Sequence, residues 1–280
     1  ENKLSIPPLA SVSDLIYASQ EIEKSEEENI LPEKKWIQQL VYPGTSLGGA
    51  RPKAGVVDEH KTLYVAKFPS RKDDYDVGLW EHLCHLLAKS AGIHAAETGV
   101  LNAGDKYHTL LSRRFDRTQD GKRIHFASAM TLLGLTDGCN AGTGNGYLDI
   151  VDFILQNCCD VESNLRELYR RVAFNICVGN SDDHFRNHGF LLTKRGWTLA
   201  PAYDMNPTTN DYQSILITAS SNKADLNLLL EASEDYMLRR HEAEAIVNEV
   251  VAALKPWKSL ATKLGISERE IALFAGRLPS

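Results

Sequence analysis

The stretch of sequence that decides the fold is Val178-Gly179-Asn180-Ser181-Asp182-Asp183-His184-Phe185-Arg186-Asn187-His188-Gly189-Phe190-Leu191-Leu192. Polar side chains crowd its centre, and apolar segments flank it on both sides. From Leu168 to Val178 the apolar residues recur at helical spacing, which predicts a helix that ends where the polar centre begins. The sequence therefore predicts a helix that delivers a loop rich in chemically active side chains.

A β-hairpin is predicted directly after this loop. Gly189–Leu192 and Trp197–Leu199 are short apolar runs typical of strands. Between them, Lys194–Gly196 offers a glycine that can take the positive φ of a tight turn. The chain continues as Leu199-Ala200-Pro201-Ala202-Tyr203-Asp204. We expect the hairpin to return the Asp204 carboxylate to the loop.

The polar side chains of the loop and of the segment after the hairpin favour chemistry on a phosphate group. They are Asp182, Asp183, His184, Asn187 and Asp204. Mg²⁺ prefers such oxygen ligands and combines few of them with phosphate oxygens and water. A remaining carboxylate is then free to accept a proton from a nucleophile. The alternative is a polar turn whose side chains cap backbone groups, which explains one Asp pair better than it explains the whole arrangement.

Two quoted segments, Asn-Ser-Asp-Asp-His-Phe-Arg-Asn and Leu-Ala-Pro-Ala-Tyr-Asp, resemble the kinase core of the HipA family. These are the serine/threonine-kinase toxins of bacterial toxin–antitoxin systems. Protein kinases place a catalytic Asp ahead of a metal-binding Asn, with a second metal-binding Asp further along. The resemblance implies that Asp182 is the catalytic base and that Asn187 and Asp204 bind Mg²⁺. It also places His184 in the ATP site, in a role that we interpret as structural.

A glycine-rich segment runs from Gly44 to Val57. Glycines let a backbone approach phosphates, although such turns are also common between strands, and the GK[ST] of a Walker A loop is absent. Ser46–Lys53 resembles the HipA phosphate-binding loop, whose Ser can be autophosphorylated. The resemblance implies a regulatory site at Ser46, with Thr45 less favoured, because an added phosphate would compete with ATP. The predicted ATP contacts of this loop are Ser46, Gly48, Gly49, Ala50 and Lys53.

Lys67 stands on the apolar run Thr62–Pro69, where a Lys is costly unless it is paired or extends to water from a strand edge. It resembles the kinase strand Lys that reaches the phosphates of ATP. Asp76–Ala91 is predicted to be an amphipathic helix. Glu81 on this helix is the expected partner of Lys67, by analogy with the kinase Lys–Glu pair.

Leu110–Arg117 resembles the HipA strand that leads into the hinge between the kinase lobes. The resemblance implies that the backbones of Arg113 and Phe115 hold the adenine of ATP. The family often has an acidic residue at the position of Arg113. Recognition by the backbone should tolerate that difference.

The predicted fold class is α+β: a two-lobed protein-kinase-like fold with a small β-rich N-lobe and a larger, mainly helical C-lobe. The predicted segments are a helical or linker segment at 1–43, the N-lobe at 44–117 and the C-lobe at 118–280. A hairpin is expected within 97–115, and a loop without an assigned role at 136–147. Helices of the C-lobe are expected at 126–135, 147–158, 165–178, 241–254, 258–264 and 267–275.

The composition is that of a folded protein, with 280 residues of which 43% are hydrophobic and 24% charged. No apolar run approaches the ~18 residues of a membrane helix. The formal net charge of −6 argues against broad binding to nucleic acid or to anionic membranes. The five cysteines are odd in number and form no CxxC pair, which favours a cytoplasmic location.

The predicted function is ATP- and Mg²⁺-dependent transfer of phosphate to a Ser or Thr hydroxyl of a protein. The HipA resemblance implies a target such as an aminoacyl-tRNA synthetase, and so inhibition of translation. It also implies an antitoxin partner that is a small DNA-binding protein. HipA toxins have an extra N-terminal subdomain, so we expect a short-form member, with that subdomain as a separate chain, or a fragment.

Two other functions are open at this point. The first is a nucleotide-binding pseudokinase, which signals through its conformation without transferring phosphate. The second is a metal-dependent phosphohydrolase that uses water as the nucleophile. Its site would be made by Asp182, Asp183, His184 and Asn187, and it would need neither Lys67 nor the Ser46 loop.

Overall fold

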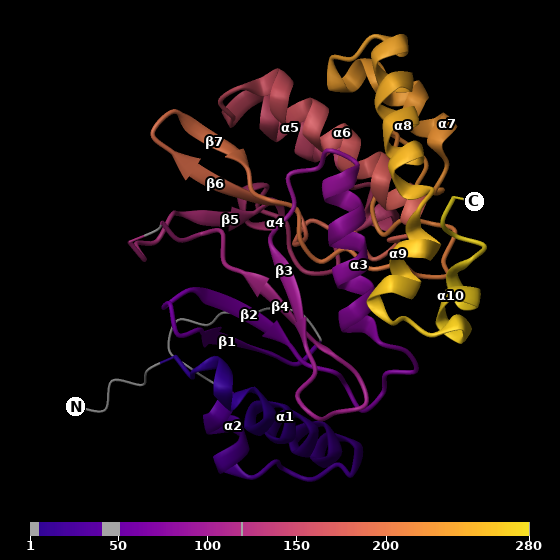
Figure 1. Cartoon of the computed structure of the whole chain (residues 1–280). Coiled ribbons are helices and arrows are strands. Elements are labelled where there is room, and N and C mark those ends of the chain that lie inside the picture. Colours follow the sequence, from indigo (N-terminus) through magenta and orange to yellow (C-terminus); the bar gives the residue numbers. More distant parts are fainter. Residues whose placement is uncertain (1–5, 41–50, 119, 280) are drawn as a thin grey trace. The chain divides into compact units, whose positions relative to one another are not determined.

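The computed structural model describes residues 6–40, 51–118 and 120–279, and the chain divides into two compact units (Figure 1). Unit 1 comprises Glu1–His82 and Glu97–Arg114, and unit 2 comprises Leu83–Ala96 and Phe115–Ser280. This division differs from the predicted segments in three places, one of which is that residues 115–117 of the predicted N-lobe belong to unit 2. The N-terminal segment belongs to the same unit as the predicted N-lobe, and residues 83–96 belong to the unit that holds the predicted C-lobe.

Unit 1 is built on a four-stranded antiparallel sheet with the strand order β1-β2-β4-β3. Its elements are α1 (Val12–Glu27), α2 (Lys34–Leu40), β1 (Lys53–Val57), β2 (Leu63–Lys67), the first part of α3 (Val77–Ser90), β3 (Thr98–Leu101) and β4 (Thr109–Arg113). Strands β3 and β4 form the predicted hairpin, with Thr98 opposite Ser112. The register of β1 and β2 places Lys53 opposite Lys67, at one end of the two strands.

Helix α1 shares an apolar core with β1 and β2, and Figure 1 shows it beside these strands. The buried members of this core are Val12, Leu15, Ile16, Ala54, Val56, Ala66 and Phe68. The acidic run Glu21–Glu28 continues the same helix, and its Glu23 accepts hydrogen bonds from Ser70 Oγ at 2.7 Å and from the Arg71 backbone N at 2.9 Å. The N-terminal segment is therefore part of the folded unit, because the sheet would lose its apolar cover without it.

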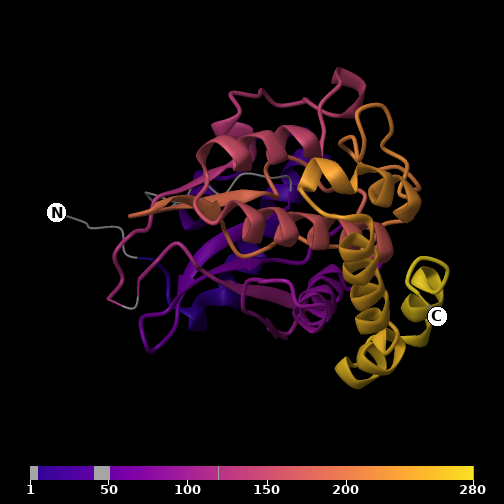
Figure 2. The same cartoon turned by 90° about the horizontal axis from the view of Figure 1, so that it is seen from above.

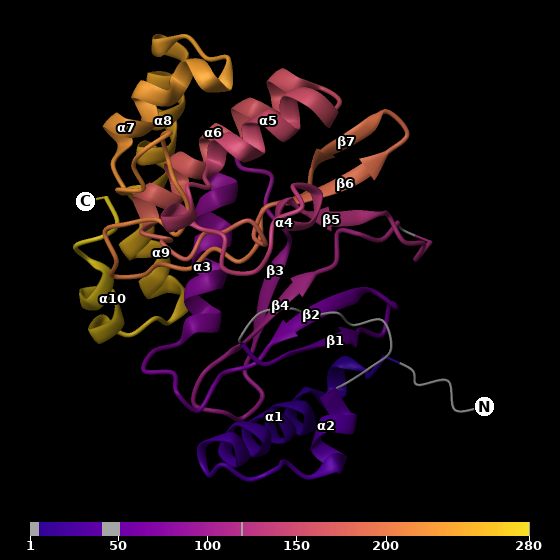
Figure 3. The same cartoon turned by 180° about the vertical axis from the view of Figure 1, so that it is seen from behind.

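Unit 2 is mainly helical and contains a three-stranded antiparallel sheet with the strand order β5-β6-β7. Besides the second part of α3, its elements are β5 (Phe126–Ser128), α4 (Ala129–Leu132), α5 (Tyr147–Asn157), α6 (Val161–Val178), β6 (Gly189–Thr193), β7 (Gly196–Leu199), α7 (Leu226–Glu231), α8 (Arg240–Leu254), α9 (Trp257–Leu264) and α10 (Glu268–Phe274). Figure 2 shows α5 and α6 running alongside β6 and β7. Figure 3 shows α9 and α10 following α8 at the C-terminal end.

The predicted helix at 126–135 is wrong at its start. Phe126–Ser128 is strand β5, which pairs with β6 so that Phe126 lies opposite Leu191 and Ser128 opposite Gly189. Only Ala129–Leu132 is helical, and the Ser128 side chain caps it by accepting from Thr131 N. The pairing overrides the helical pattern because it satisfies the free edge of β6 with backbone hydrogen bonds.

The predicted hairpin at 189–199 is confirmed, with β6 and β7 joined by a turn in which Gly196 has φ 128°. Asn164 of α6 holds this hairpin, because its side-chain oxygen accepts from Leu199 N at 2.7 Å. The three predicted C-terminal helices are present as α8, α9 and α10, and Ser267 caps α10. Within the part of the chain that the structure describes, no helix is both long and apolar enough to cross a bilayer.

Candidate functional site

The loop that carries the candidate catalytic residues begins where α6 ends. Gly179 ends the helix in the left-handed conformation, with φ 71°, and its N–H donates to the carbonyls of the last turn. A side chain at this position would be strained by the backbone conformation and would also meet the Thr208 carbonyl oxygen at 3.1 Å. The sharp turn frees residues 180–188 from the helix and brings them back toward β6.

The buried side chain of Asp183 anchors this loop to the protein interior. It is 2% exposed, and its Oδ2 accepts hydrogen bonds from Tyr147 Oη at 2.6 Å, Asn175 Nδ2 at 2.8 Å and His188 Nε2 at 2.8 Å. Burial alone would raise the pKa of Asp183, but His188 and the hydrogen bonds from His188 and Tyr147 hold it below its ordinary value. Side chains from α5, from α6 and from the residue just before β6 thus converge on one ionised carboxylate.

Asp182 points the other way, because its side chain is exposed while its neighbour is buried. Desolvation by the surrounding loop raises the pKa of Asp182, and the nearby carboxylates of Asp204 and Asp183 raise it further against the opposing effect of His184. The Nδ2 of Asn187 donates to the Asp182 carbonyl at 3.2 Å, which fixes the backbone on both sides of the turn. A raised pKa makes a carboxylate a better proton acceptor, as a general base requires.

Asp204 is the third member of this site, and its backbone is strained. Its φ of 60° is in the left-handed region, which costs a residue other than glycine about 1–3 kcal/mol. The preceding Tyr203 is half-buried and donates its hydroxyl to the Arg186 carbonyl at 2.6 Å. This bond ties the residue before Asp204 to the residue before Asn187, so the two predicted metal ligands lie on adjoining segments.

The donor chemistry of these two residues fits Mg²⁺. Asn187 uses its amide nitrogen to hold the Asp182 carbonyl, so the amide oxygen is the atom that would coordinate a cation. Asp204 offers carboxylate oxygens. Both are hard oxygen ligands of the kind that Mg²⁺ takes alongside phosphate and water.

In unit 1, the Nζ of Lys67 lies 2.7 Å from Oε1 and 3.0 Å from Oε2 of Glu81. Both side chains are largely buried, at 11% exposed for Lys67 and 3% for Glu81. The Lys on β2 and the Glu on α3 are therefore brought together in the pairing expected from the sequence. Lys53, another predicted ATP contact, lies opposite Lys67 in the sheet.

The start of α3 is fixed by two residues that the sequence reasoning did not single out. Asp76 accepts from Leu79 N at 3.0 Å as the helix cap, and its other oxygen pairs with Nδ1 of His108 at 2.5 Å. Gly78 lies so close to β4 that an added Cβ would stand 2.4 Å from the His108 carbonyl oxygen. These contacts set the position of the helix that carries Glu81.

The remaining predicted site residues fall into two groups. Thr45, Ser46, Gly48, Gly49 and Ala50 lie outside the described residues. Arg113 ends β4, with its side chain paired to Glu97 at 2.7 Å and its N–H bonded to the Glu97 carbonyl at 2.8 Å. Phe115 stacks in unit 2, with its ring centre 5.8 Å from that of Phe126 and 5.7 Å from that of Tyr203.

The sequence reasoning also missed Tyr147, Asn175, His188 and Tyr203 as residues that position the loop. A signal is present for Asn175, since it stands inside the otherwise apolar run 172–178. Their convergence also bears on the hydrolase alternative. Asp183 Oδ2 already accepts three buried hydrogen bonds, which argues against this oxygen as a ligand of a metal shared with Asp182.

The comparisons with known proteins agree on one family. The family model described as the HipA-like C-terminal domain matches residues 45–257. A Haemophilus influenzae protein named only as a candidate kinase is 28% identical over 195 residues, covering 62% of this chain and 57% of the relative. The serine/threonine-protein kinase toxin HipA of Shewanella oneidensis is 24% identical over 241 residues, covering 76% of this chain and 54% of the relative.

Among solved structures, the complex of Shewanella oneidensis HipA with HipB and operator DNA contains a similar chain. The TM-score is 0.68 at 18% identity, and the match covers 93% of this chain and 68% of the other. A likeness at this identity shows the fold, so the predicted α+β kinase-like fold is confirmed. The chain spans a little over half the length of the two curated relatives.

Proposed function

The chain belongs to the HipA-like C-terminal domain family, and on that premise we propose that it is an ATP-dependent kinase that phosphorylates a Ser or Thr hydroxyl of a protein. The buried pair of Lys67 and Glu81 is the single observation that carries this proposal. Protein kinases need such a pair to hold the Lys toward the phosphates of ATP. A phosphohydrolase has no comparable use for a Lys on this strand.

In this proposal each polar residue of the site has one task. Lys67, oriented by Glu81, would contact the α- and β-phosphates. Asn187 and Asp204 would hold Mg²⁺, which would supply positive charge to the phosphates. Arg113 and Phe115 hold adenine through their backbones, and the glycine-rich loop covers the phosphates. His184 keeps the loop geometry beside the nucleotide.

Asp182 accepts the proton of the attacking hydroxyl. Its exposure lets a substrate approach, and the raised pKa suits proton transfer. Most of the rate enhancement then comes from positioning and from charge neutralisation, as in other phosphoryl transfers. The buried Asp183 serves this step indirectly, because it fixes the backbone from which Asp182 projects.

The experiment that tests the proposal is the intact mass of the purified chain after incubation with Mg²⁺ and ATP, with Asp182→Asn as the matched variant. We expect the wild type to gain phosphate and Asp182→Asn to gain none while it still binds ATP. Phosphate gained equally by both would remove Asp182 from the role of base. ATP binding without phosphate on the chain or on any protein of a cell extract would favour the pseudokinase alternative.

We propose that Ser46 is the autophosphorylation site that inactivates the kinase. Phosphate carries about −1.5 to −2 charges, which would compete with ATP for the loop amides. The family resemblance supports this assignment, and Ser46→Ala tests it. The variant should lose the phosphopeptide that contains residue 46, and an unchanged phosphopeptide map would place the site elsewhere.

The toxin role is also proposed on the basis of family membership. The similar HipA chain was solved together with HipB and operator DNA. By analogy, we propose that this chain has a small DNA-binding antitoxin as its partner. Its target is a protein of translation such as an aminoacyl-tRNA synthetase. Phosphoproteomics of cells that express the wild type or Asp182→Asn would identify the target, and no translation protein among the differences would contradict this role.

A further inference from the structure

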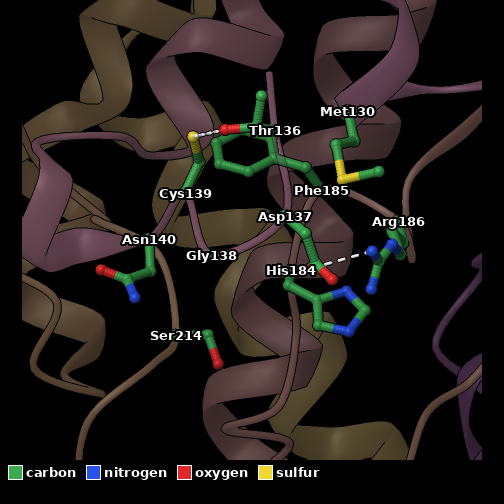
Figure 4. Close-up of a pocket in the computed structure, with 10 residues that line it drawn as sticks. All are labelled: Met130, Thr136, Asp137, Gly138, Cys139, Asn140, His184, Phe185, Arg186 and Ser214. Carbon is green, nitrogen blue, oxygen red and sulfur yellow. Dashed lines mark hydrogen bonds and ion pairs between the residues drawn. The ribbon is translucent and has the colours of Figure 1, made fainter. Parts of the chain in front are cut away.

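A pocket of about 190 Å³ lies in unit 2, directly beside the candidate catalytic loop. One wall consists of the loop residues His184, Phe185 and Arg186, and the opposite wall comes from residues 136–140 (Figure 4). Residues 136–140 begin the polar loop for which the sequence predicts no role. The pocket therefore places this loop next to the candidate catalytic residues.

The walls of the pocket are fixed to the catalytic loop by backbone hydrogen bonds. Ser214 N donates to the Ser181 carbonyl at 2.9 Å, and the Ser214 carbonyl accepts from Ala141 N at 2.8 Å. On the other side, Met130 N donates to the Phe185 carbonyl at 3.2 Å. The pocket is thus assembled from three chain segments that are tied to the segment carrying Asp182.

The size of the pocket limits what can enter it. Sites for nucleotides and drug-sized ligands usually measure about 300–1,000 Å³. A pocket of about 190 Å³ is too small for a nucleotide and suits one amino-acid side chain. The segment of a protein substrate next to the accepting hydroxyl would present such a side chain to the loop.

The charges in the pocket indicate which side chain it takes. Arg186 pairs with Asp137 at 2.8 Å, and Figure 4 shows the two side chains facing each other. The Asp137 side chain is 78% exposed and that of Arg186 is 37% exposed. An ion pair this exposed contributes only about 0–1 kcal/mol, so another carboxylate can replace Asp137 at little cost. A guanidinium binds carboxylates through two parallel hydrogen bonds.

We propose that this pocket binds an Asp or Glu side chain of the protein substrate close to the phosphorylated hydroxyl, with Arg186 as its partner. In the absence of substrate, Asp137 takes the place of that carboxylate. Thr136, Asn140 and Ser214 offer further polar groups around it. The proposal rests on the proposed kinase function, and it gives that kinase a preference for acidic sequence around its target Ser or Thr.

Cys139 provides a test that does not depend on catalysis, because it lines the pocket and is partly exposed. The full chain is alkylated with iodoacetamide, and the rate at each cysteine is measured by mass spectrometry. Cys158 and Cys159, which do not line the pocket, report any general effect on the protein. The probes are two pools of capped pentapeptides with a central Ser. Each peptide of the first pool carries a Glu at one of the other positions, and each peptide of the second pool carries a Gln there instead.

We expect the Glu pool to slow alkylation of Cys139 and to act at up to about fivefold lower concentration than the Gln pool, which corresponds to the ~1 kcal/mol upper end for one exposed ion pair. Cys158 and Cys159 should react unchanged. Equal action of the two pools, or no action of the Glu pool, would overturn the proposal. Protection by MgADP alone would also overturn it, because the pocket would then serve the nucleotide.

Two Arg→Gln substitutions, one inside the pocket and one outside it, test whether Arg186 causes the difference between the pools. Arg186→Gln should abolish the difference between the pools, whereas Arg195→Gln, which breaks the exposed pair with Asp160 outside the pocket, should preserve it. Asp137→Asn removes the competing carboxylate and should make the Glu pool act at lower concentration. A pool difference that survives Arg186→Gln would exclude Arg186 as the partner.

The same samples, given Mg²⁺ and ATP, separate this proposal from the proposed function. Protection of Cys139 by the Glu pool without phosphate on any peptide would support the pocket and contradict the kinase. Phosphorylation of both pools at equal rates, without protection, would support the kinase and contradict the pocket. Faster phosphorylation of the Glu pool that is lost in Arg186→Gln would support both.

Discussion

Asp182 and Asp183 are neighbours in the chain, but one side chain is exposed and the other is 2% exposed. The turn after Gly179 sends them to opposite sides of the loop. Asp182 faces the site, where its pKa is raised, and Asp183 faces inward, where buried donors hold its pKa low. At the scale of single residues, the structure therefore gives one carboxylate an exposed position, which suits the proposed chemistry, and its neighbour a buried position that holds the loop.

The Asp183→Asn and Asp182→Asn substitutions should consequently change the stability of the fold by very different amounts. Asp183→Asn replaces an ionised acceptor of three buried donors with a neutral amide, so the free energy of unfolding should fall by about 3 kcal/mol. Asp182→Asn changes an exposed side chain and should alter stability by less than about 0.5 kcal/mol. Urea denaturation followed by circular dichroism measures both. Equal stability losses would show that Asp183 is not the anchor.

At the scale of elements, α3 shows how a helix with a predicted partner residue is held in place. The sequence predicts the helix from its apolar periodicity and Glu81 from kinase analogy. It does not predict that the helix starts against β4, where Asp76 joins His108 and where Gly78 leaves no room for a side chain. The position of Glu81 relative to Lys67 depends on this close approach.

Gly78→Ala tests that approach. The new Cβ would stand 2.4 Å from the His108 carbonyl oxygen, so the helix start and β4 must separate. We expect a loss of about 2 kcal/mol in stability, although Ala favours a helix by about 1 kcal/mol over Gly. The control is Gly99→Ala in β3, where an added Cβ meets no described atom within 4 Å. A thermal transition that is unchanged for Gly78→Ala would contradict the close packing.

Helix α8 begins with an acid whose titration should affect stability. Glu242 accepts hydrogen bonds from the backbone N of Arg239 and from the side chains of Arg166 and Arg239, which lower its pKa to about 2 from an ordinary 4.5. Because the folded pKa is the lower one, the stabilisation is complete above about pH 4.5 and is lost as the pH falls through about 2.

Glu242→Gln should therefore lower the urea midpoint at pH 7, and the difference from wild type should close as the pH falls from about 4.5 to 2. Glu244→Gln is the matched control on the same helix, since it breaks only an exposed pair with Arg240. Its effect at pH 7 should be smaller. A Glu242→Gln difference that stayed constant down to pH 2 would show that the ionised carboxylate is not what stabilises the helix start.

At the scale of the whole molecule, the chain forms two compact units, and the N-terminal helix is an integral part of the first. Ile16 on α1 is 5% exposed in the core shared with the sheet, whereas the adjacent Tyr17 is 53% exposed. The sheet that carries Lys53 and Lys67 depends on this cover. The helix is thus remote from the candidate site residues in sequence but supports the strands that carry two of them.

Ile16→Ala should remove about 2–5 kcal/mol of stability, mainly from unit 1. Hydrogen exchange should become faster in β1 and β2, while α5, α6 and α8 of unit 2 keep their protection. Tyr17→Ala, one position along the helix, should leave exchange in the sheet nearly unchanged. Equally faster exchange throughout unit 2 would show that the two units unfold as one.

The sequence by itself determined the family, the α+β fold class and most elements, because periodicity, turn residues and motif spacing are local properties of the chain. It also predicted the pair of Lys67 and Glu81, which the structure contains. For Asp182, Asn187 and Asp204 it gave proposed roles, which rest on the spacing of a kinase motif. Its error at 126–135 arose where a short segment could satisfy the edge of a distant strand.

Only the tertiary structure decided which polar residues are anchors and which face the site. The inward turn of Asp183, the bond from Tyr203 to Arg186 and the pocket between residues 136–140 and the catalytic loop each join segments far apart in the sequence. Burial decides these pairings, because a polar group removed from water must find a partner wherever the packed chain supplies one. No local pattern records that partner before the chain has folded.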